Sequence, residues 1–199
     1  MALIRSTRAT APPPDPADDP RAALAEGRAS ARRDAARRLA ADPQAVAPLA
    51  ERLAVEGDTS VREAILGALA RIGSPEAVAH LVGLLDSEDV WLRNAAIEVL
   101  QDLDGAVLDA LAASLSHPAS DRRIFAVNVL AALRHPAAGD LALRALAEDP
   151  HVNVCAAALD VLAEIGTPAM VPAIEGAKAR FPDEPFLHFA ARAAIRRIA

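Results

Sequence analysis

One local pattern recurs about every 31 residues along this 199-residue chain, and that period constrains the fold more than any other feature. The pattern is centred on a leucine, and successive centres lie 30, 31, 30 and 32 residues apart. The five centres are Leu39, Leu69, Leu100, Leu130 and Leu162. A period of this size is typical of solenoids, in which each unit buries its apolar face only against its neighbours. We therefore expect a stack of near-identical units that functions through its surface.

Apolar residues around each centre follow the spacing of a helix. Ile65, Leu66 and Ile72 lie four before, three before and three after Leu69, which is the stripe of an amphipathic helix. Gly73 follows this stripe, and Gly166 follows the last one, where a left-handed residue is expected to end the helix.

A second helix is expected to follow in each unit. Pro75, Pro136 and Pro168 each stand six residues after a central leucine, and proline favours the first position of a helix. Hydrophobic residues make up 53% of the chain, largely alanine and leucine, while aromatic residues make up 3% and tyrosine is absent. Alanine and leucine are strong helix formers, so the class is all-α.

The domain organisation follows from the period. We expect a tail at residues 1–19, whose prolines at 12–16 exclude a helix and whose Leu3-Ile4 pair also suits a short docking peptide. Residues 20–199 then form one solenoid, beginning with a lead-in helix at 20–26. Its units fall near 28–57, 58–88, 89–120, 121–150 and 151–183, and a cap at 184–199 presents arginines outward.

Charge and cysteine content exclude several classes of function. The net charge is −6, and residues 58–151 carry 7 arginines against 14 acids, which argues against a nucleic-acid partner. The chain contains no run of about 18 uncharged apolar residues, so no transmembrane helix is expected. The single cysteine, Cys155, allows no disulfide framework within the chain and fits a reducing cytoplasm.

Short motifs inside the repeats carry a family resemblance. Val61-Arg62 and Leu92-Arg93 open first helices, and Ile72-Gly73-Ser74-Pro75 joins two helices. With these motifs the chain resembles HEAT repeats, and in particular the short bacterial subclass that also occurs in phycobilin lyases. The resemblance implies a right-handed α-solenoid of about five helical hairpins with a C-terminal capping helix. It also implies that the second helices line a concave face on which protein partners dock.

An arginine stands seven residues before four of the central leucines, and Cys155 takes the fifth place. These arginines are Arg32, Arg62, Arg93 and Arg123. A ladder of arginines suits phosphate binding, but the acidic middle of the chain favours a structural role in which each arginine reaches an acid or a carbonyl of a neighbouring unit. Cys155 lies among small apolar residues and is expected to be a buried, inert thiol.

The sequence predicts no catalytic, metal or cofactor site. The five histidines never pair at helical spacing, and the chain contains no His-Glu dipeptide of the kind that metal-binding HEAT hydroxylases carry. No glycine-rich phosphate loop and no nucleophile elbow are present.

Two surfaces are candidates for protein binding. Trp91, the only tryptophan, occupies a column that is otherwise polar and lies beside Glu88 and Asp89, so it suits an interface anchor. The alternative is that Trp91 folds down over an adjacent repeat. The second candidate is the concave second-helix face, where mostly small residues predict a shallow groove able to accept a helix or a strand. Its residues include His80, Gly83, Asp109, Ala113 and Arg144.

The function predicted from the sequence is a non-catalytic, cytoplasmic, protein-binding scaffold or adaptor. The family resemblance places such proteins in bacterial signalling assemblies, including chemosensory ones. The alternative is a phycobilin-lyase-like factor for bilin attachment or chaperoning, against which the few aromatic residues and the acidic middle speak. A nucleic-acid reader is a further rival that the charge disfavours.

Overall fold

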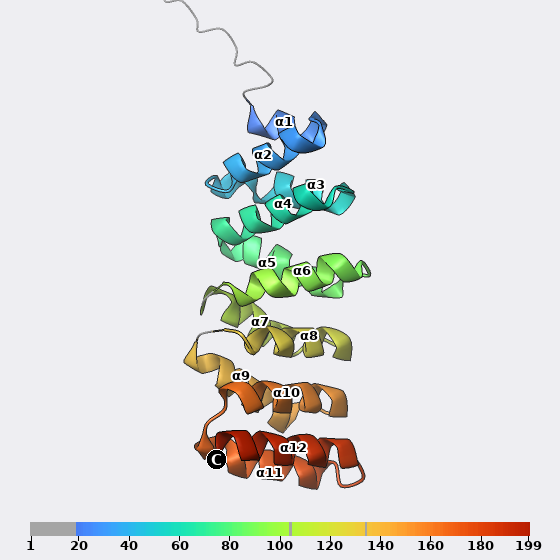
Figure 1. Ribbon diagram of the computed structural model, residues 1–199, viewed down its shortest axis with the longest axis vertical. Coiled ribbons are helices and arrows are strands. Elements are labelled where there is room, and N and C mark those ends of the chain that lie inside the picture. The colour runs from blue at the N-terminus through green and yellow to red at the C-terminus, as the bar shows by residue number, and fades with distance from the viewer. Residues whose placement is uncertain (1–18, 104, 134) are drawn as a thin grey trace, which may run out of the picture.

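The computed structural model describes residues 19–103, 105–133 and 135–199, and these residues form an α-solenoid (Figure 1). Five helical hairpins follow one another along the long axis, as the period predicted. The first helices are α2 (Ala29–Leu39), α4 (Thr59–Ile72), α6 (Val90–Gln101), α8 (Ser120–Leu130) and α10 (Val152–Ile165). The second helices are α3 (Val46–Val55), α5 (Pro75–Gly83), α7 (Leu108–Ser114), α9 (Pro136–Glu148) and α11 (Val171–Arg180). Helix α1 (Pro20–Glu26) precedes the hairpins and α12 (Pro185–Ile198) follows them.

The core runs as one continuous layer through the stack. All five central leucines lie in it, with Leu39 2% exposed and the other four fully buried. The first helices stack in a row, in which α10 packs against both α8 and α12 (Figure 1). Because each helix buries its stripe against the next unit, stability depends on neighbours rather than on one central core.

Helix starts are fixed by side chains that accept backbone N–H groups. The Asp19 carboxylate accepts from Arg21 N at 2.9 Å, which confirms the lead-in helix, and Asp58 accepts from the first residues of α4. The Ser74 hydroxyl accepts from Ala77 N at 3.2 Å. Each of these bonds satisfies a donor that the first turn of a helix leaves unpaired.

The two glycines expected to end helices in the left-handed region behave differently. Gly73 has φ of 58° and ends α4 as predicted. The prediction is wrong for Gly166, which has φ of −69° and an extended conformation. Gly166 instead allows a close approach, because a Cβ there would meet the carbonyl oxygen of Leu162.

The prolines mark the second helices with one exception. Pro75 and Pro136 are the first residues of α5 and α9. Pro168 begins a 3₁₀ turn, Pro168–Met170, and α11 starts only at Val171. Similar 3₁₀ turns at Pro43–Ala45, Leu84–Asp86 and Gly105–Val107 adjoin α3, α5 and α7.

The C-terminal helix is less polar on the outside than expected. Arg192, Arg196 and Arg197 of α12 are exposed, as predicted for a cap. However, Phe186 and Phe189 are also exposed, at 45% and 63%. The expected tail lies outside the described residues except for Asp19. No helix of the described residues has the length and hydropathy needed to cross a bilayer.

Candidate functional site

The second helices form the surface that carries most of the predicted contact residues. His80 and Gly83 lie on α5, Asp109 and Ala113 on α7, and Arg144 on α9, and all five are exposed. A Cβ built at Gly83 would meet no atom within 4 Å, so open space lies above this helix. The structure therefore places these residues on one series of neighbouring helices, which we call the second-helix face.

An apolar groove of about 430 Å³ opens on this face between α3 and α5. One wall consists of alanines of α3, namely Ala47, Ala50 and Ala54. His80 and Leu84 form the opposite wall. We call this cavity the α3/α5 groove.

The floor of the α3/α5 groove reaches through to the first helices. Leu69 of α4 and Leu92 of α6 lie there together with Leu53 of α3, and all three side chains are otherwise buried. Glu51 carries the only carboxylate in this lining. Such a groove suits the apolar side chains of a docked helix, because it exposes hydrocarbon to water and offers few polar groups to satisfy.

The other predicted residues of the face do not line this groove. Arg144 lies two repeats further on, donating to the Ala112 carbonyl oxygen at 3.4 Å. It borders a separate polar pocket of about 320 Å³ with His117 and Glu148. Of the five residues predicted for this face, His80 is the one that lines the α3/α5 groove.

Trp91 is half-buried rather than fully exposed. Its ring packs against the core, and the Arg62 guanidinium of the preceding repeat lies over it at 5.7 Å from the ring centroid. This cation–π contact corresponds to the alternative in which Trp91 covers an adjacent repeat. The remaining ring surface borders a groove of about 510 Å³ with Glu63 and Asn94.

The acids beside Trp91 differ in their roles. Asp89 begins α6, accepting from Leu92 N at 3.1 Å, and also accepts from Arg62 Nη1 at 2.9 Å. These bonds, the one from Leu92 N first, hold the pKa of Asp89 below its ordinary value. Glu88 is exposed. Asp89 is thus used structurally, and Trp91 stays a predicted contact residue with a reduced free surface.

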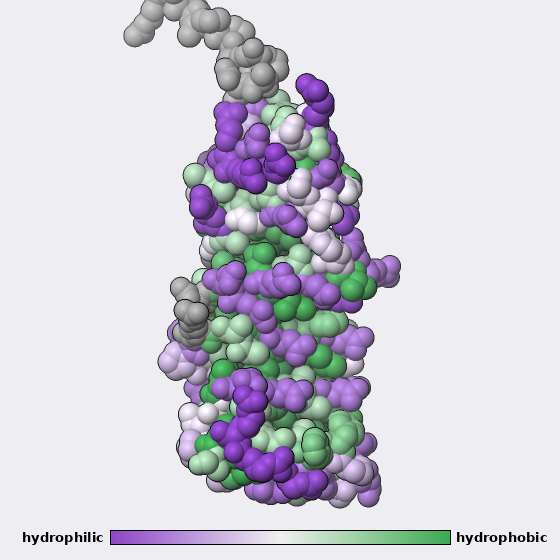
Figure 2. Space-filling model, viewed as in Figure 1, coloured by the Kyte–Doolittle hydropathy of each residue, from purple (hydrophilic) through white to green (hydrophobic). Residues whose placement is uncertain are grey.

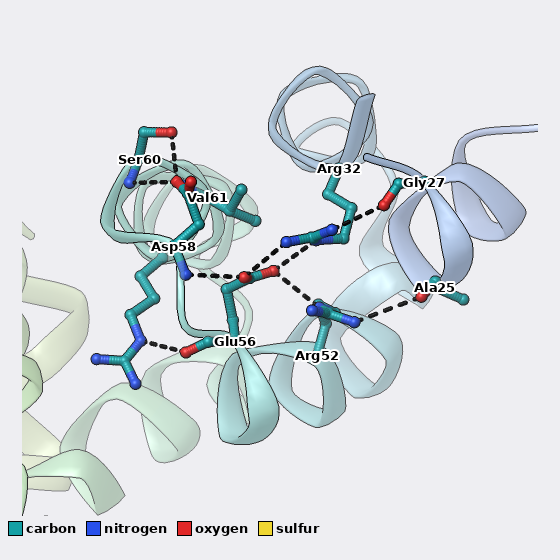
Figure 3. A network of polar contacts seen from close by, with 9 residues as sticks. Ala25, Gly27, Arg32, Arg52, Glu56, Asp58, Ser60 and Val61 are labelled. Atoms are coloured by element: carbon teal, nitrogen blue, oxygen red, sulfur yellow. Dashed lines mark hydrogen bonds and ion pairs between the residues drawn. The ribbon is translucent and has the colours of Figure 1, made fainter. Parts of the chain in front are cut away.

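The arginine column joins successive repeats, as its structural interpretation predicted. Figure 3 shows Arg32 of α2 reaching Glu56, with Nε and Nη2 donating to its two carboxylate oxygens at 2.7 and 2.8 Å. Arg52 Nε donates to the same carboxylate at 2.9 Å, and so does Asp58 N. Glu56 is 2% exposed, so four donors satisfy a carboxylate that is almost removed from water.

This network lowers the pKa of Glu56. Hydrogen bonding by Arg32 outweighs the penalty of burial and lowers the pKa of Glu56 from 4.5 to about 2. The carboxylate therefore stays ionised throughout the neutral range. It connects α2, α3 and the start of α4.

Arg123 repeats this arrangement further down the stack. Its Nε and Nη2 donate to the two carboxylate oxygens of Asp149 at 2.6 and 2.9 Å, and Nη1 donates to the His117 carbonyl oxygen. Burial raises the pKa of Asp149, but Arg123 and the backbone N–H of His151 outweigh it, so the net shift is downward. Arg62 and Arg93 find other partners, Asp89 and the Phe125 ring, respectively.

The acids that complete this column were missed from the sequence. A position thirteen residues before the central leucine holds Glu56, Ser87, His117 and Asp149 in successive units. The arginine of the preceding repeat forms a bidentate ion pair only where this position is acidic, which is the case for Glu56 and Asp149. The signal is present in the sequence, because aligning the repeats on their central leucines brings these four residues into one column.

Cys155 is buried, as expected, and burial raises the pKa of its thiol above the ordinary value. Its Sγ donates to the Asp149 carbonyl oxygen at 3.4 Å. Arg180, from the end of α11, donates to the carbonyl oxygens of Leu146 and Asp149 at 2.6 Å each. An arginine from the following helix therefore binds the loop where the column lacks its own. Among the described residues, no three His, Cys, Asp or Glu side chains group closely enough for a metal ion.

Comparison with known proteins identifies the repeat. A model of HEAT repeats matches residues 17–101 and 108–195, which is most of the sequence. The chain belongs to the HEAT-repeat family. This assignment agrees with the paired helices and the stacked core described above.

A bilin biosynthesis protein, PecE of Mastigocladus laminosus, is 44% identical to this HEAT-repeat chain over 87 residues. The match covers 43% of this chain and 32% of PecE, so the chain spans about a third of the length of that relative. The identity is high for the region that matches, but it concerns only part of each protein.

Two solved structures are similar to this chain at low sequence identity. Human deoxyhypusine hydroxylase in complex with glycerol is 19% identical, with 89% of this chain and 82% of that chain covered and a TM-score of 0.49. The complex of CpcE and CpcF of phycocyanin lyase from Nostoc sp. PCC7120 is 21% identical, with 99% and 100% covered and a TM-score of 0.37.

Proposed function

We propose that this HEAT-repeat chain is a protein-binding subunit of a bilin-biosynthesis assembly and holds a bilin-acceptor protein on its second-helix face. The 44% identity with PecE over 87 residues carries the proposal. The α3/α5 groove supports it, because an open apolar surface on a rigid repeat suits a docked helix. A signalling role, expected from the sequence, receives no support from the relatives described above.

The lining of the α3/α5 groove favours protein side chains over the pigment. A linear tetrapyrrole carries two propionate groups, which call for basic residues, and flat rings, which call for aromatic walls. The groove offers alanine and leucine, with Glu51 at its rim. We therefore assign the groove to the acceptor protein, and the bilin to the assembled complex rather than to this chain alone.

The test measures bilin transfer and acceptor binding separately. The chain is incubated with phycocyanobilin and an apo-phycobiliprotein subunit, while bilin absorbance and covalent attachment are followed. Binding to the acceptor alone is measured by calorimetry. The proposal expects acceptor binding and faster or more specific attachment when the chain is present.

Variants localise the contact. Ala54→Glu places a charge in the groove wall and should weaken acceptor binding at least about tenfold, because the carboxylate must be buried or the helix displaced. Ala31→Glu is the matched control, because it adds the same charge to an exposed alanine of α2, a first helix that does not belong to the second-helix face. Equal affinities for the two variants, or attachment indifferent to the chain, would contradict the proposal.

A protein adaptor unconnected with bilins is the second candidate. The groove lining favours it, since no aromatic or arginine side chain stands there. Affinity purification from the native host distinguishes the two functions by whether a bilin-binding protein is recovered. In the same experiment, Trp91→Ala and Ala113→Glu test the two surfaces predicted from the sequence.

A further inference from the structure

The first helices also border a groove, which lies between α2 and α4. It has a volume of about 560 Å³ and a floor of small residues, Ala40, Ala64, Gly67 and Ala68. A Cβ built at Gly67 would meet no atom within 4 Å, so the space above α4 is open. Small residues in a floor allow the backbone of another helix to approach closely.

Three arginines border this groove, two from α2 and one from α4. Arg33 and Arg37 lie one turn apart on α2. In the repeat alignment Gly67 of α4 corresponds to Arg37, and Arg71 lies one turn beyond Gly67. Arg33 and Arg37 are therefore about 6 Å apart along α2, and Arg71 lines the same groove from the adjacent helix α4.

The charge of these arginines is poorly compensated within the described residues. Arg33 and Arg37 approach the same Asp34 oxygen, at 3.8 and 3.6 Å, which exceeds hydrogen-bonding distance. The Nε of Arg33 is buried and makes no hydrogen bond among the described residues. Glu63 is the only acid in the lining. Figure 2 shows the resulting hydrophilic surface over α2, in a protein whose net charge is −6.

We propose that this basic groove binds an acidic α-helix of a protein partner. Carboxylates at positions i and i+4 of that helix meet Arg33 and Arg37 of α2, and the carboxylate at i+8 on the same face is offered to Arg71 of α4, while the backbone lies over Gly67. The one-turn spacing of Arg33 and Arg37 favours a helix, because residues i and i+4 of a helix lie on the same face at a matching separation. The proposal is independent of the bilin-related function, which uses the second-helix face.

The probe is a synthetic helical peptide of about 16 residues, long enough to hold helix when side-chain stapled. One version carries Glu at i, i+4 and i+8 on a single face. The other has the same composition with the three Glu residues spread around the helix. Binding is measured by fluorescence anisotropy at low and at physiological salt. We expect the aligned peptide to bind about tenfold more tightly, with a difference that shrinks as salt screens the charges.

Variants of the full chain locate the site. The double variant Arg33→Gln with Arg37→Gln should lose about tenfold in affinity for the aligned peptide. The control removes the same charge far away, through Arg192→Gln with Arg196→Gln on α12, and should leave affinity unchanged. Gly67→Gln fills the groove and should abolish binding while keeping or raising the Tm, because the added side chain meets open space within a helix.

Three outcomes would overturn the proposal. The first is equal affinity for the aligned and the spread peptides. The second is an equal loss in the groove variant and in the α12 control. The third is tighter binding to a DNA duplex than to the aligned peptide, which would make the groove a phosphate-binding surface instead.

Discussion

Replacing Glu56 by glutamine tests how the repeats are joined at the N-terminal end of the stack. The substitution keeps the shape of the side chain but removes the charge that four donors share. It also turns an amide N–H₂ toward arginines that can only donate. Arg32 and Arg52 are then left beside a nearly buried neutral group.

The size of the effect follows from the pKa of Glu56. A lowering from 4.5 to about 2 corresponds to roughly 3 kcal/mol of interaction with the ionised form. Breaking a buried ion pair from one side costs a similar amount, about 3–5 kcal/mol. We therefore expect Glu56→Gln to reduce the free energy of unfolding by about 3 kcal/mol at pH 7.

The effect has a defined pH dependence. Because the folded pKa lies below the unfolded one, the stabilisation is fully present above pH 4.5 and is lost as the pH falls toward about 2. The difference between the wild type and Glu56→Gln should therefore shrink across this window. Urea unfolding followed by circular dichroism at pH 7, 5, 4 and 3 measures it, and hydrogen exchange reports whether α2–α4 opens locally.

Glu51→Gln provides the control, because it removes an exposed carboxylate from α3, the helix that Glu56 directly follows, and lies outside the network. It should change the free energy of unfolding by no more than about 0.5 kcal/mol. The reasoning is refuted if both variants lose equal stability at pH 7. It is also refuted if the deficit of Glu56→Gln is the same at pH 3 as at pH 7.

Three further predictions concern the core. Leu100→Ala, which empties a fully buried position, should cost about 2–5 kcal/mol, measured by urea unfolding. Gly166→Ala should lower the Tm, because the added Cβ meets the Leu162 carbonyl oxygen. Gly176→Ala, in open space on α11, should raise the Tm. A fall in the Tm of both variants would contradict this reasoning. The Cys155 thiol should react with a thiol reagent only on unfolding, so rapid labelling of the native protein would be evidence against its burial.

Much of the fold was predictable because its signals are local. Gly73 ends α4 and Pro75 begins α5 through backbone preferences that act over a few residues. Gly166 was misjudged, because its extended conformation is coupled to a close approach of the Leu162 carbonyl oxygen rather than to a positive φ. The prediction that Pro168 begins an α-helix was also only partly correct, because a proline fixes its own φ but does not decide between a 3₁₀ turn and an α-helix.

The candidate sites were harder to predict than the helices. The predicted contact residues on the second helices are exposed, and their role stays a prediction. Nothing in the sequence indicated that a groove between α3 and α5 reaches Leu69 and Leu92. For Trp91, the polar column suggested exposure, whereas Arg62 of the preceding repeat covers one side of the ring. The groove between α2 and α4 depends on two helices that lie thirty residues apart in sequence.

The sequence by itself determined the period, the all-α class and the pairing of helices into hairpins, because these follow from apolar spacing and helix-end residues within each unit. Only the tertiary structure decided which acid meets which arginine and where the helices part to leave grooves. Those features arise between repeats, where the separation and rotation of neighbouring helices depend on the packing of many side chains together.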